Sequence, residues 1–222
     1  MKDIHAVKGR FLIGRLVAEG EHECQDFKYK ISDARKIARS LSAFANHKGG
    51  RLLIGVKDNG VIAGVRSEED IFMIETAAGS FCHPEPAVSF KAYKATDDGA
   101  VVVIATVEPI PDASEYICVK EQDGHLQAYI RVADENIAMP PYMMQARSLR
   151  GSIPGITLGA TSPEAAVIDT INALRGEATL DQVLKKVKAS RLAATDAIVR
   201  LLAISALRST YSAGAFRLSF PT

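Results

Sequence analysis

The residues best suited to chemistry in this sequence are bases that gather between residues 23 and 51. Seven bases stand there against three acids, which are Glu23, Asp26 and Asp33. The bases are Lys28, Lys30, Arg35, Lys36, Arg39, Lys48 and Arg51. A cluster of this kind could line a surface that binds phosphates. The alternative is a solvent-exposed helix face, which we favour for the three bases of residues 35–39.

Two glycine-containing turns lie close to these bases. Gly49 and Gly50 stop a helix, because glycine adopts a positive φ at little cost. The pair could also let backbone N–H groups approach a phosphate, although a helix stop is the commoner role. Asp58, Asn59 and Gly60 form a strong tight-turn signal. No Gly-x-x-x-x-Gly-Lys-Ser/Thr motif occurs, so the residues do not support an ATPase or helicase.

The first 150 residues alternate between helical and extended patterns. Helices are predicted over residues 5–18, from a cap at Ser32 or Asp33 to the Gly pair, and over 68–81. A closing helix is predicted within residues 136–149, starting at or just before Pro140 and Pro141. Strands are predicted over residues 23–30, 51–56, 61–65, 88–94, 100–107, 116–120 and 126–132. Residues 51–65 read as a hairpin around Asp58. In the strand over 23–30, Asp26 and Lys28 share one face and Phe27 takes the other.

The sequence changes character at residue 151. Residues 151–162 carry no charge and are rich in glycine, so we interpret them as a linker. Residues 163–222 then predict helices from Ser162, over 179–187 and over 192–206, followed by strands over 207–210 and 215–220. Three short helices and a hairpin are typical of a winged helix-turn-helix. The expected architecture is therefore α+β: a mixed sheet with flanking helices in residues 1–150, and a small winged-helix domain in residues 163–222.

Composition excludes several classes of protein. No apolar run is long enough for a membrane span, and the N-terminus lacks the pattern of a signal peptide. The three cysteines are too widely spaced for a zinc pair or a disulfide framework, so we expect reduced thiols and a cytoplasmic location. Residues 1–150 hold 19 Lys and Arg against 21 Asp and Glu, and residues 163–222 hold 8 against 5. The mildly basic second domain permits contact with phosphates without requiring it.

Several short motifs occur in one order along residues 5–150. They are Glu21, Asp26-Phe27-Lys28, Ala43-Phe44-Ala45-Asn46, Gly49-Gly50, Leu53-Ile54-Gly55-Val56, Asp58-Asn59-Gly60 and Tyr129-Ile130-Arg131. This order resembles the Schlafen/Alba-type DNA-binding domain of many bacterial proteins, which often carry a C-terminal helix-turn-helix. The resemblance implies a nucleic-acid-binding protein that acts as a transcriptional regulator.

The same resemblance extends to animal Schlafen proteins, some of which cut RNA. Carried over by motif, their acidic site falls on Glu21, Asp26 and Asp58, where three converging carboxylates could hold Mg²⁺ or Mn²⁺. The family usually has Glu where this sequence has Asp26, and the shorter side chain weakens that implication. The alternative is that Asp58 only forms a turn and that Asp26 pairs with Lys28 or Arg131.

We therefore expect a nucleic-acid-binding homodimer, with DNA favoured over RNA, no membrane contact, no cofactor and no enzymatic activity. The expected phosphate ligands are Lys28, Lys48, Arg51, Arg131, Lys188 and Arg191. Arg131 could equally lie in a buried ion pair. The third helix of the second domain offers few side chains that could read bases, so that domain serves either for DNA binding or for dimerisation. The rival hypothesis is a divalent-metal-dependent ribonuclease that uses Glu21, Asp26 and Asp58.

Overall fold

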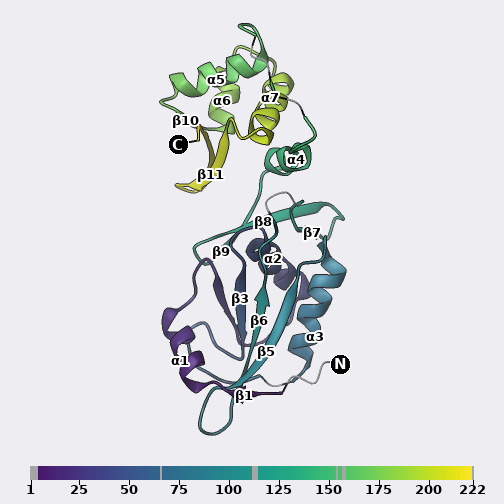
Figure 1. Ribbon diagram of the computed structural model, residues 1–222, viewed down its shortest axis with the longest axis vertical. Helices are drawn as coiled ribbons and strands as arrows, with labels where there is room; N and C mark the ends of the chain where they lie inside the picture. The colour runs from purple at the N-terminus through teal and green to yellow at the C-terminus, as the bar shows by residue number, and fades with distance from the viewer. Residues whose placement is uncertain (1–4, 66, 112–114, 154, 157–158, 222) are drawn as a thin grey trace. The chain divides into compact units, whose positions relative to one another are not determined.

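The computed structural model describes residues 5–65, 67–111, 115–153, 155–156 and 159–221. The chain divides into two compact units, Met1–Ala138 and Met139–Thr222, which we describe separately. Both contain helices and strands, which confirms the α+β class (Figure 1). Among the described residues, no helix has the length and apolar character that a membrane span requires.

A five-stranded mixed sheet forms the centre of the first unit. Its strand order is β1-β5-β6-β3-β2. The strands are β1 (Val7–Lys8), β2 (Gln25–Lys28), β3 (Gly50–Ile54), β5 (Val88–Lys94) and β6 (Val101–Val107). β1 pairs with β5 and β2 pairs with β3 in parallel, whereas the other two pairings are antiparallel. The edge strand β2 and its neighbour β3 therefore end at the same side of the sheet.

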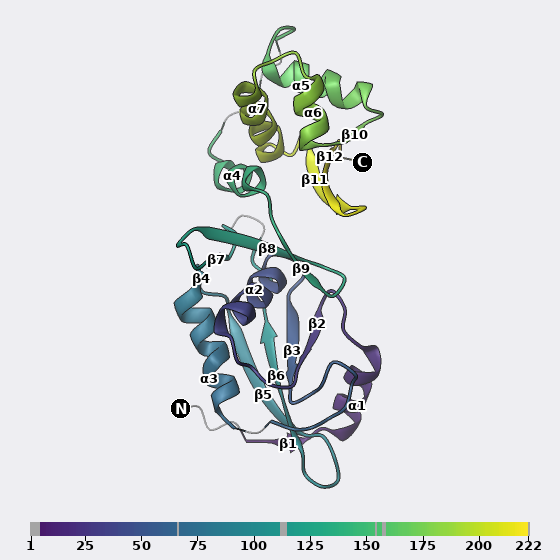
Figure 2. The same ribbon diagram turned by 180° about the vertical axis from the view of Figure 1, so that it is seen from behind.

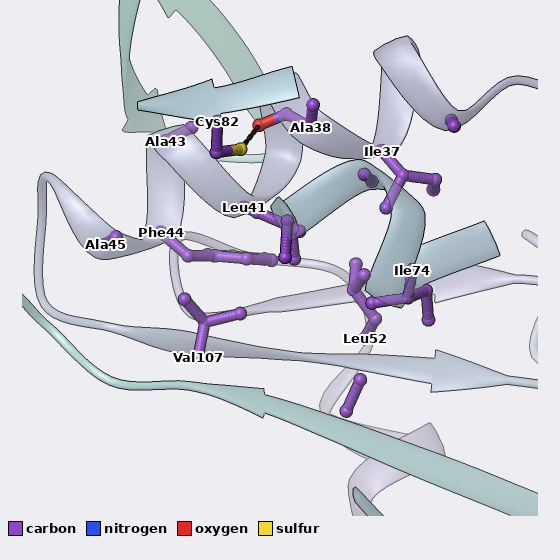
Figure 3. Packing of buried hydrophobic residues seen from close by; sticks show 14 of the residues in the cluster. Ile37, Ala38, Leu41, Ala43, Phe44, Ala45, Leu52, Ile74, Cys82 and Val107 are labelled. Carbon is purple, nitrogen blue, oxygen red and sulfur yellow. Dashed lines mark hydrogen bonds between the residues drawn. The ribbon is translucent and has the colours of Figure 1, made fainter. Parts of the chain in front are cut away.

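Helices cover both faces of this sheet. α2 (Ala34–Ala45) and α3 (Glu69–Thr76), which continues into the π-helical segment η1 (Ala77–Phe81), lie over one face (Figure 2). α1 (Arg10–Glu19) packs on the other face. Successive β3 side chains alternate between the two cores: Leu52 and Ile54 pack with α2, and Leu53 packs with α1. Figure 3 shows Leu41 and Phe44 of α2 pointing toward the sheet.

A second, antiparallel sheet packs against α2. It has the order β4-β7-β8-β9 and consists of β4 (Cys82–His83), β7 (Cys118–Lys120), β8 (Leu126–Val132) and β9 (Glu135–Ala138). Val119 and Tyr129 of this sheet share the core of α2. Residues 135–138 extend this sheet by pairing with β8, and the closing helix begins at the expected prolines, with Pro140 as its cap and Pro141 as its first residue.

The hairpin predicted over residues 51–65 forms its turn but not its return strand. β3 pairs with β2 and β6, and the expected return strand is reduced to one bridge between Val56 and Ile62. Gly55 has a φ of 94°, and a Cβ atom there would lie 2.7 Å from the carbonyl carbon of Gly64. The chain reverses in the turn at residues 57–61, where Gly60 N–H donates to the carbonyl oxygen of Lys57 at 2.7 Å, and the returning segment then packs against Gly55.

The second unit contains α4 (Pro141–Leu149), α5 (Pro163–Ala173), α6 (Leu180–Lys186), α7 (Arg191–Ala203) and a small sheet. The sheet has the order β10-β12-β11, with β10 (Glu177–Thr179), β11 (Arg208–Ser212) and β12 (Ala215–Ser219). Tyr142 and Ala146 of α4 belong to its core, so α4 joins this unit and not the first, to which we assigned it. Of the expected linker, residues 154, 157 and 158 lie outside the described residues.

Candidate nucleic-acid interface

The end of β2 presents Asp26 and Lys28 on the face of the sheet that α2 covers. Phe27 points to the opposite face, where it is 2% exposed in the core beside α1. In the parallel pairing, Phe27 lies opposite Leu53 and Lys28 lies opposite Ile54. The strands that bear Phe27 and Ile54 therefore lie side by side. The alternation of the strand places an acid and a base together next to α2.

Asp26 is a buried carboxylate between two cations. Its Oδ2 atom lies 2.8 Å from Nζ of Lys28, and its Oδ1 atom lies 3.7 Å from Nη2 of Arg131. The first distance is that of a charge-assisted hydrogen bond, whereas the second is too long for one. Nζ of Lys28 also donates to the carbonyl oxygen of Phe27 at 2.8 Å. Asp26 therefore neutralises Lys28 more fully than it neutralises Arg131.

Arg131 is buried but only partly bonded. Its residue is 2% exposed, its guanidinium carbon lies 5.0 Å from the centre of the Phe44 ring, and Nη1 donates to Oδ1 of Asn136 at 2.8 Å. Asn136 in turn donates to Oγ of Ser40 at 3.0 Å. Among the described residues, Nε and Nη2 of Arg131 have no hydrogen-bond partner. A buried donor without a partner costs free energy, so these two atoms favour the arrival of an acceptor.

A groove of about 560 Å³ opens above these residues. It runs between the end of β2, α2 and the turn that joins β8 to β9. Five bases line it, and we call it the cationic groove: Lys28, Lys30, Lys36, Arg39 and Arg131. Four acids also line it: Asp26, Asp33, Asp134 and Glu135. Within the described part of the chain, the exposed side chains of Lys30 and Lys36 form no ion pair.

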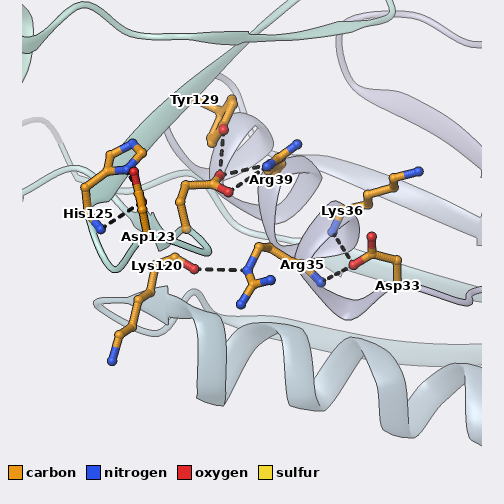
Figure 4. Close-up of polar contacts among 9 residues, drawn as sticks. Asp33, Arg35, Lys36, Arg39, Lys120, Asp123, His125 and Tyr129 are labelled. Carbon is orange, nitrogen blue, oxygen red and sulfur yellow. Dashed lines mark hydrogen bonds and ion pairs between the residues drawn. The ribbon is translucent and has the colours of Figure 1, made fainter.

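Arg39 belongs to a fixed polar cluster on α2 (Figure 4). Its Nε and Nη2 atoms donate to the two carboxylate oxygens of Glu121 at 2.9 and 2.6 Å, and the hydroxyl of Tyr129 donates to Glu121 at 2.6 Å. The hydrogen bond from Arg39 lowers the pKa of Glu121. Burial, and to a smaller extent the hydrogen bond to Glu121, raise the pKa of Tyr129 to about 12. The side chain of Arg39 is therefore bound within the protein, whereas that of Lys36, on the same helix, forms no ion pair among the described residues and can bind a ligand.

The three acids expected to form a metal site are not brought together. Oε1 of Glu21 accepts from the backbone N–H of Phe27 at 2.8 Å. Burial, and then the contact with Asp26, raise the pKa of Glu21. Asp58 lies in the exposed turn after β3. Among the described residues, no group of three or more His, Cys, Asp or Glu side chains could hold a metal ion. The structure thus pairs Glu21 with Asp26 and does not group Asp58 with them.

Lys48 and Arg51 lie at the opposite end of the parallel strands, outside the groove. Nζ of Lys48 donates to Oε1 of Glu23 at 2.8 Å. Arg51 donates to Gln25 and Glu19, each at 2.6 Å. The bases that appeared as one cluster in the sequence are therefore separated by the fold. Lys28 lines the groove together with Arg131 from β8, whereas Lys48 and Arg51 are bound by neighbouring side chains.

The Ala-Phe-Ala-Asn and Gly-Gly motifs have a structural role. Nδ2 of Asn46 donates to the carbonyl oxygens of Ile117 and Tyr129 at 2.9 Å each, and its Oδ1 accepts from Ile117 N at 2.8 Å. Asn46 thereby ties the end of α2 to the second sheet. A Cβ atom on Gly50 would lie 2.3 Å from the Phe44 ring, so the tight approach of these residues requires glycine. Sequence reasoning missed the role of Asn46, since its partners lie about 70 and 80 residues away.

In the second unit, Lys188 and Arg191 stand at the start of α7. Lys188 is exposed, and Nη2 of Arg191 lies 4.0 Å from Oδ1 of Asp181, with both side chains exposed. Ser190 caps the helix by accepting from the N–H of Ala193 at 3.2 Å. Leu192 next to them is 73% exposed. These side chains are free to meet a partner.

Comparison with known proteins agrees with the order of motifs in the first unit. Residues 21–140, more than half of the chain, match the family described as Schlafen, AlbA_2. The chain belongs to this family. The AlbA_2 region begins at Glu21, and it contains the β2 edge, α2 and the β8–β9 hairpin that line the cationic groove.

Outside the AlbA_2 family match, the comparisons are distant. No curated protein matches the chain. A crystal structure of the DIP2311 protein from Corynebacterium diphtheriae is similar at 17% identity with a TM-score of 0.45. The match covers 96% of this chain and 51% of that one, so the chain spans about half the length of that protein.

Proposed function

We propose that this AlbA_2 protein binds nucleic acid and that the cationic groove holds phosphate. The observation that carries the proposal is the set of donors in the groove: two exposed lysines, Lys30 and Lys36, that form no ion pair with any described residue, and the incompletely bonded guanidinium of Arg131. Phosphate oxygens are the acceptors that such donors bind best. Membership of the AlbA_2 family supports the same role.

We further propose that the second unit is a winged helix and that the protein is a DNA-binding transcriptional regulator. Three helices followed by the β11–β12 hairpin support this proposal, with α7 as the recognition helix. Lys188 and Arg191 would contact phosphates, and Leu192 would contact the methyl group of thymine. We infer a homodimer because a helix-turn-helix of this size commonly reads two half-sites.

A fluorescence anisotropy titration of labelled duplex DNA across salt concentrations tests this function. Each phosphate contact is expected to contribute about −0.9 to the slope of log affinity against log salt concentration. A matched pair of double variants locates the contacts. Lys30→Gln with Lys36→Gln removes two charges from the groove, and Lys91→Gln with Lys94→Gln removes two exposed charges from β5. Affinity that is independent of salt, or equal losses from the two pairs, would contradict the proposal.

One observation favours a second candidate function, a metal-dependent ribonuclease. Glu21 and Asp26 are neighbouring carboxylates, and burial and this contact raise the pKa of Glu21. Incubation of the protein with structured RNA and Mn²⁺ tests the candidate, with Asp58→Asn and Glu21→Gln as variants. RNA that stays intact removes the ribonuclease, and cleavage that both variants abolish would establish it.

A further inference from the structure

The cationic groove is lined by a buried cation, Arg131, whose hydrogen-bond donors are only partly bonded within the described part of the chain. Arg131 is 2% exposed, and two of its three nitrogen atoms have no hydrogen-bond partner in the described part of the chain. The nearest carboxylate oxygen, Oδ1 of Asp26, is 3.7 Å away, and the other oxygen of Asp26 is committed to Lys28. Arg131 lines the groove, so an anion that reached its buried Nε and Nη2 atoms would meet a partly bonded fork of donors.

Two exposed lysines of the groove, Lys30 and Lys36, which we call the rim, could bind further oxygen atoms of the same anion. Lys30 and Lys36 are exposed and line the groove without an ion pair among the described residues. Lys28 also lines the groove, and its ammonium group is bonded to Asp26 and to the carbonyl oxygen of Phe27.

The acids that line the groove limit the number of phosphate groups that can bind in it. Asp33 lines it at the start of α2, and Asp134 and Glu135 line it from the turn between β8 and β9. A strand that crossed the groove would carry its next phosphates past these carboxylates, and like charges repel. Tyr129 is the aromatic residue of the described lining, and it is 9% exposed with its hydroxyl bonded to Glu121, so it offers no surface for base stacking.

We propose that the cationic groove is a site for a single terminal phosphomonoester, the phosphate at the end of a nucleic-acid strand or on a free nucleotide. This inference rests on the proposed function and specifies the group that the groove recognises. A terminal phosphate carries more charge than an internal diester and presents three terminal oxygens. Those oxygens match Arg131 below and the two rim lysines above. The volume of about 560 Å³ is that of a small-ligand site and not of a duplex track.

Anisotropy with internally labelled single-stranded DNA tests the proposal at one fixed salt concentration. Three strands of the same sequence are compared: one phosphorylated at the 5′ end, one at the 3′ end and one with hydroxyls at both ends. A phosphorylated strand is expected to bind about tenfold more tightly than the hydroxyl strand, the effect of one added charge-assisted hydrogen bond. Adenosine monophosphate and inorganic phosphate are titrated as competitors and, by calorimetry, as direct ligands.

Replacement of the buried Arg131 is expected to weaken the fold, so the test relies on the rim. The double variant Lys30→Gln with Lys36→Gln should abolish the preference, and Lys91→Gln with Lys94→Gln should keep it. Competition by adenosine monophosphate, lost in the rim variant, would identify a free nucleotide as a sufficient ligand. Its absence, with the strand preference intact, would identify a strand end.

The outcomes separate this inference from the proposed function. Equal, salt-dependent affinity for the three strands, without binding of the nucleotide, overturns the phosphomonoester site and leaves nucleic-acid binding in place. Binding of adenosine monophosphate at the rim without affinity for any strand supports the site and overturns the proposed function. A preference that persists in the rim variant also overturns the inference.

Discussion

Arg131 lies beside Asp26 without bonding to it: Nη2 is 3.7 Å from Oδ1, while Oδ2 bonds Lys28 at 2.8 Å. One buried carboxylate thus balances two cations, and the two chain positions are 105 residues apart. This arrangement makes Asp26 the residue on which both the stability of the first unit and the charge of the groove depend.

Asp26→Asn is expected to destabilise the first unit by about 3 kcal/mol, because removal of one partner leaves buried charge uncompensated. Hydrogen exchange of the β3 and β6 amides measures the free energy of opening of that unit. Asp58→Asn is the matched control, since Asp58 lies in an exposed turn, and it should change this free energy little. Equal effects of the two substitutions would show that Asp26 does not balance the buried arginine.

Glu121→Gln is expected to remove part of the acid sensitivity of the first unit. The hydrogen bonds from Arg39 lower the pKa of Glu121 below its ordinary value of 4.5. The carboxylate therefore stabilises the folded state above that value, and this contribution is lost as the pH falls through the lowered pKa. Denaturation midpoints between about pH 6 and about pH 3 should show the two proteins converging on acidification. Parallel pH profiles would contradict this account.

Gly49→Ala is expected to destabilise the first unit more than Gly99→Ala. Both glycines have positive φ, 76° and 86°, so both substitutions add backbone strain of about 1–2 kcal/mol. A Cβ atom on Gly49 would also lie 2.8 Å from the carbonyl oxygen of Val107, whereas nothing lies within 4 Å of one on Gly99. The overlap should add about 1–3 kcal/mol. Thermal denaturation of the two variants checks the difference, and equal midpoints would contradict it.

Arg191→Gln is expected to weaken DNA binding and to lower the salt slope by about 0.9, the contribution of one phosphate contact. The matched control is Arg175→Gln, which removes the same charge from the loop after α5. Anisotropy titrations of duplex DNA at several salt concentrations check both variants. If the two variants behave alike, α7 does not face the phosphates.

The local elements of this chain follow closely from its sequence. Asp33 was expected as a helix cap, and it accepts from the N–H groups of Arg35 and Lys36 at 2.9 and 3.2 Å. The alternation of Asp26, Phe27 and Lys28 predicted which side chains share a face, and the strands predicted over residues 88–94 and 100–107 are present as β5 and β6. The order of motifs led to the AlbA_2 family, which the match over residues 21–140 confirms. Capping, side-chain alternation and tight turns depend on residues a few positions apart, so a local reading captures them.

Tertiary structure alone decided the composition of the groove. The sequence shows seven bases in one stretch, but the fold separates Lys48 and Arg51 from Lys28 and carries Arg131 to Asp26. It also replaces the expected return strand by β2 and β6 as the neighbours of β3. These outcomes depend on which distant segments compete for a sheet edge and a helix face. That competition is settled by the burial of the whole core, and no local period in the sequence records it.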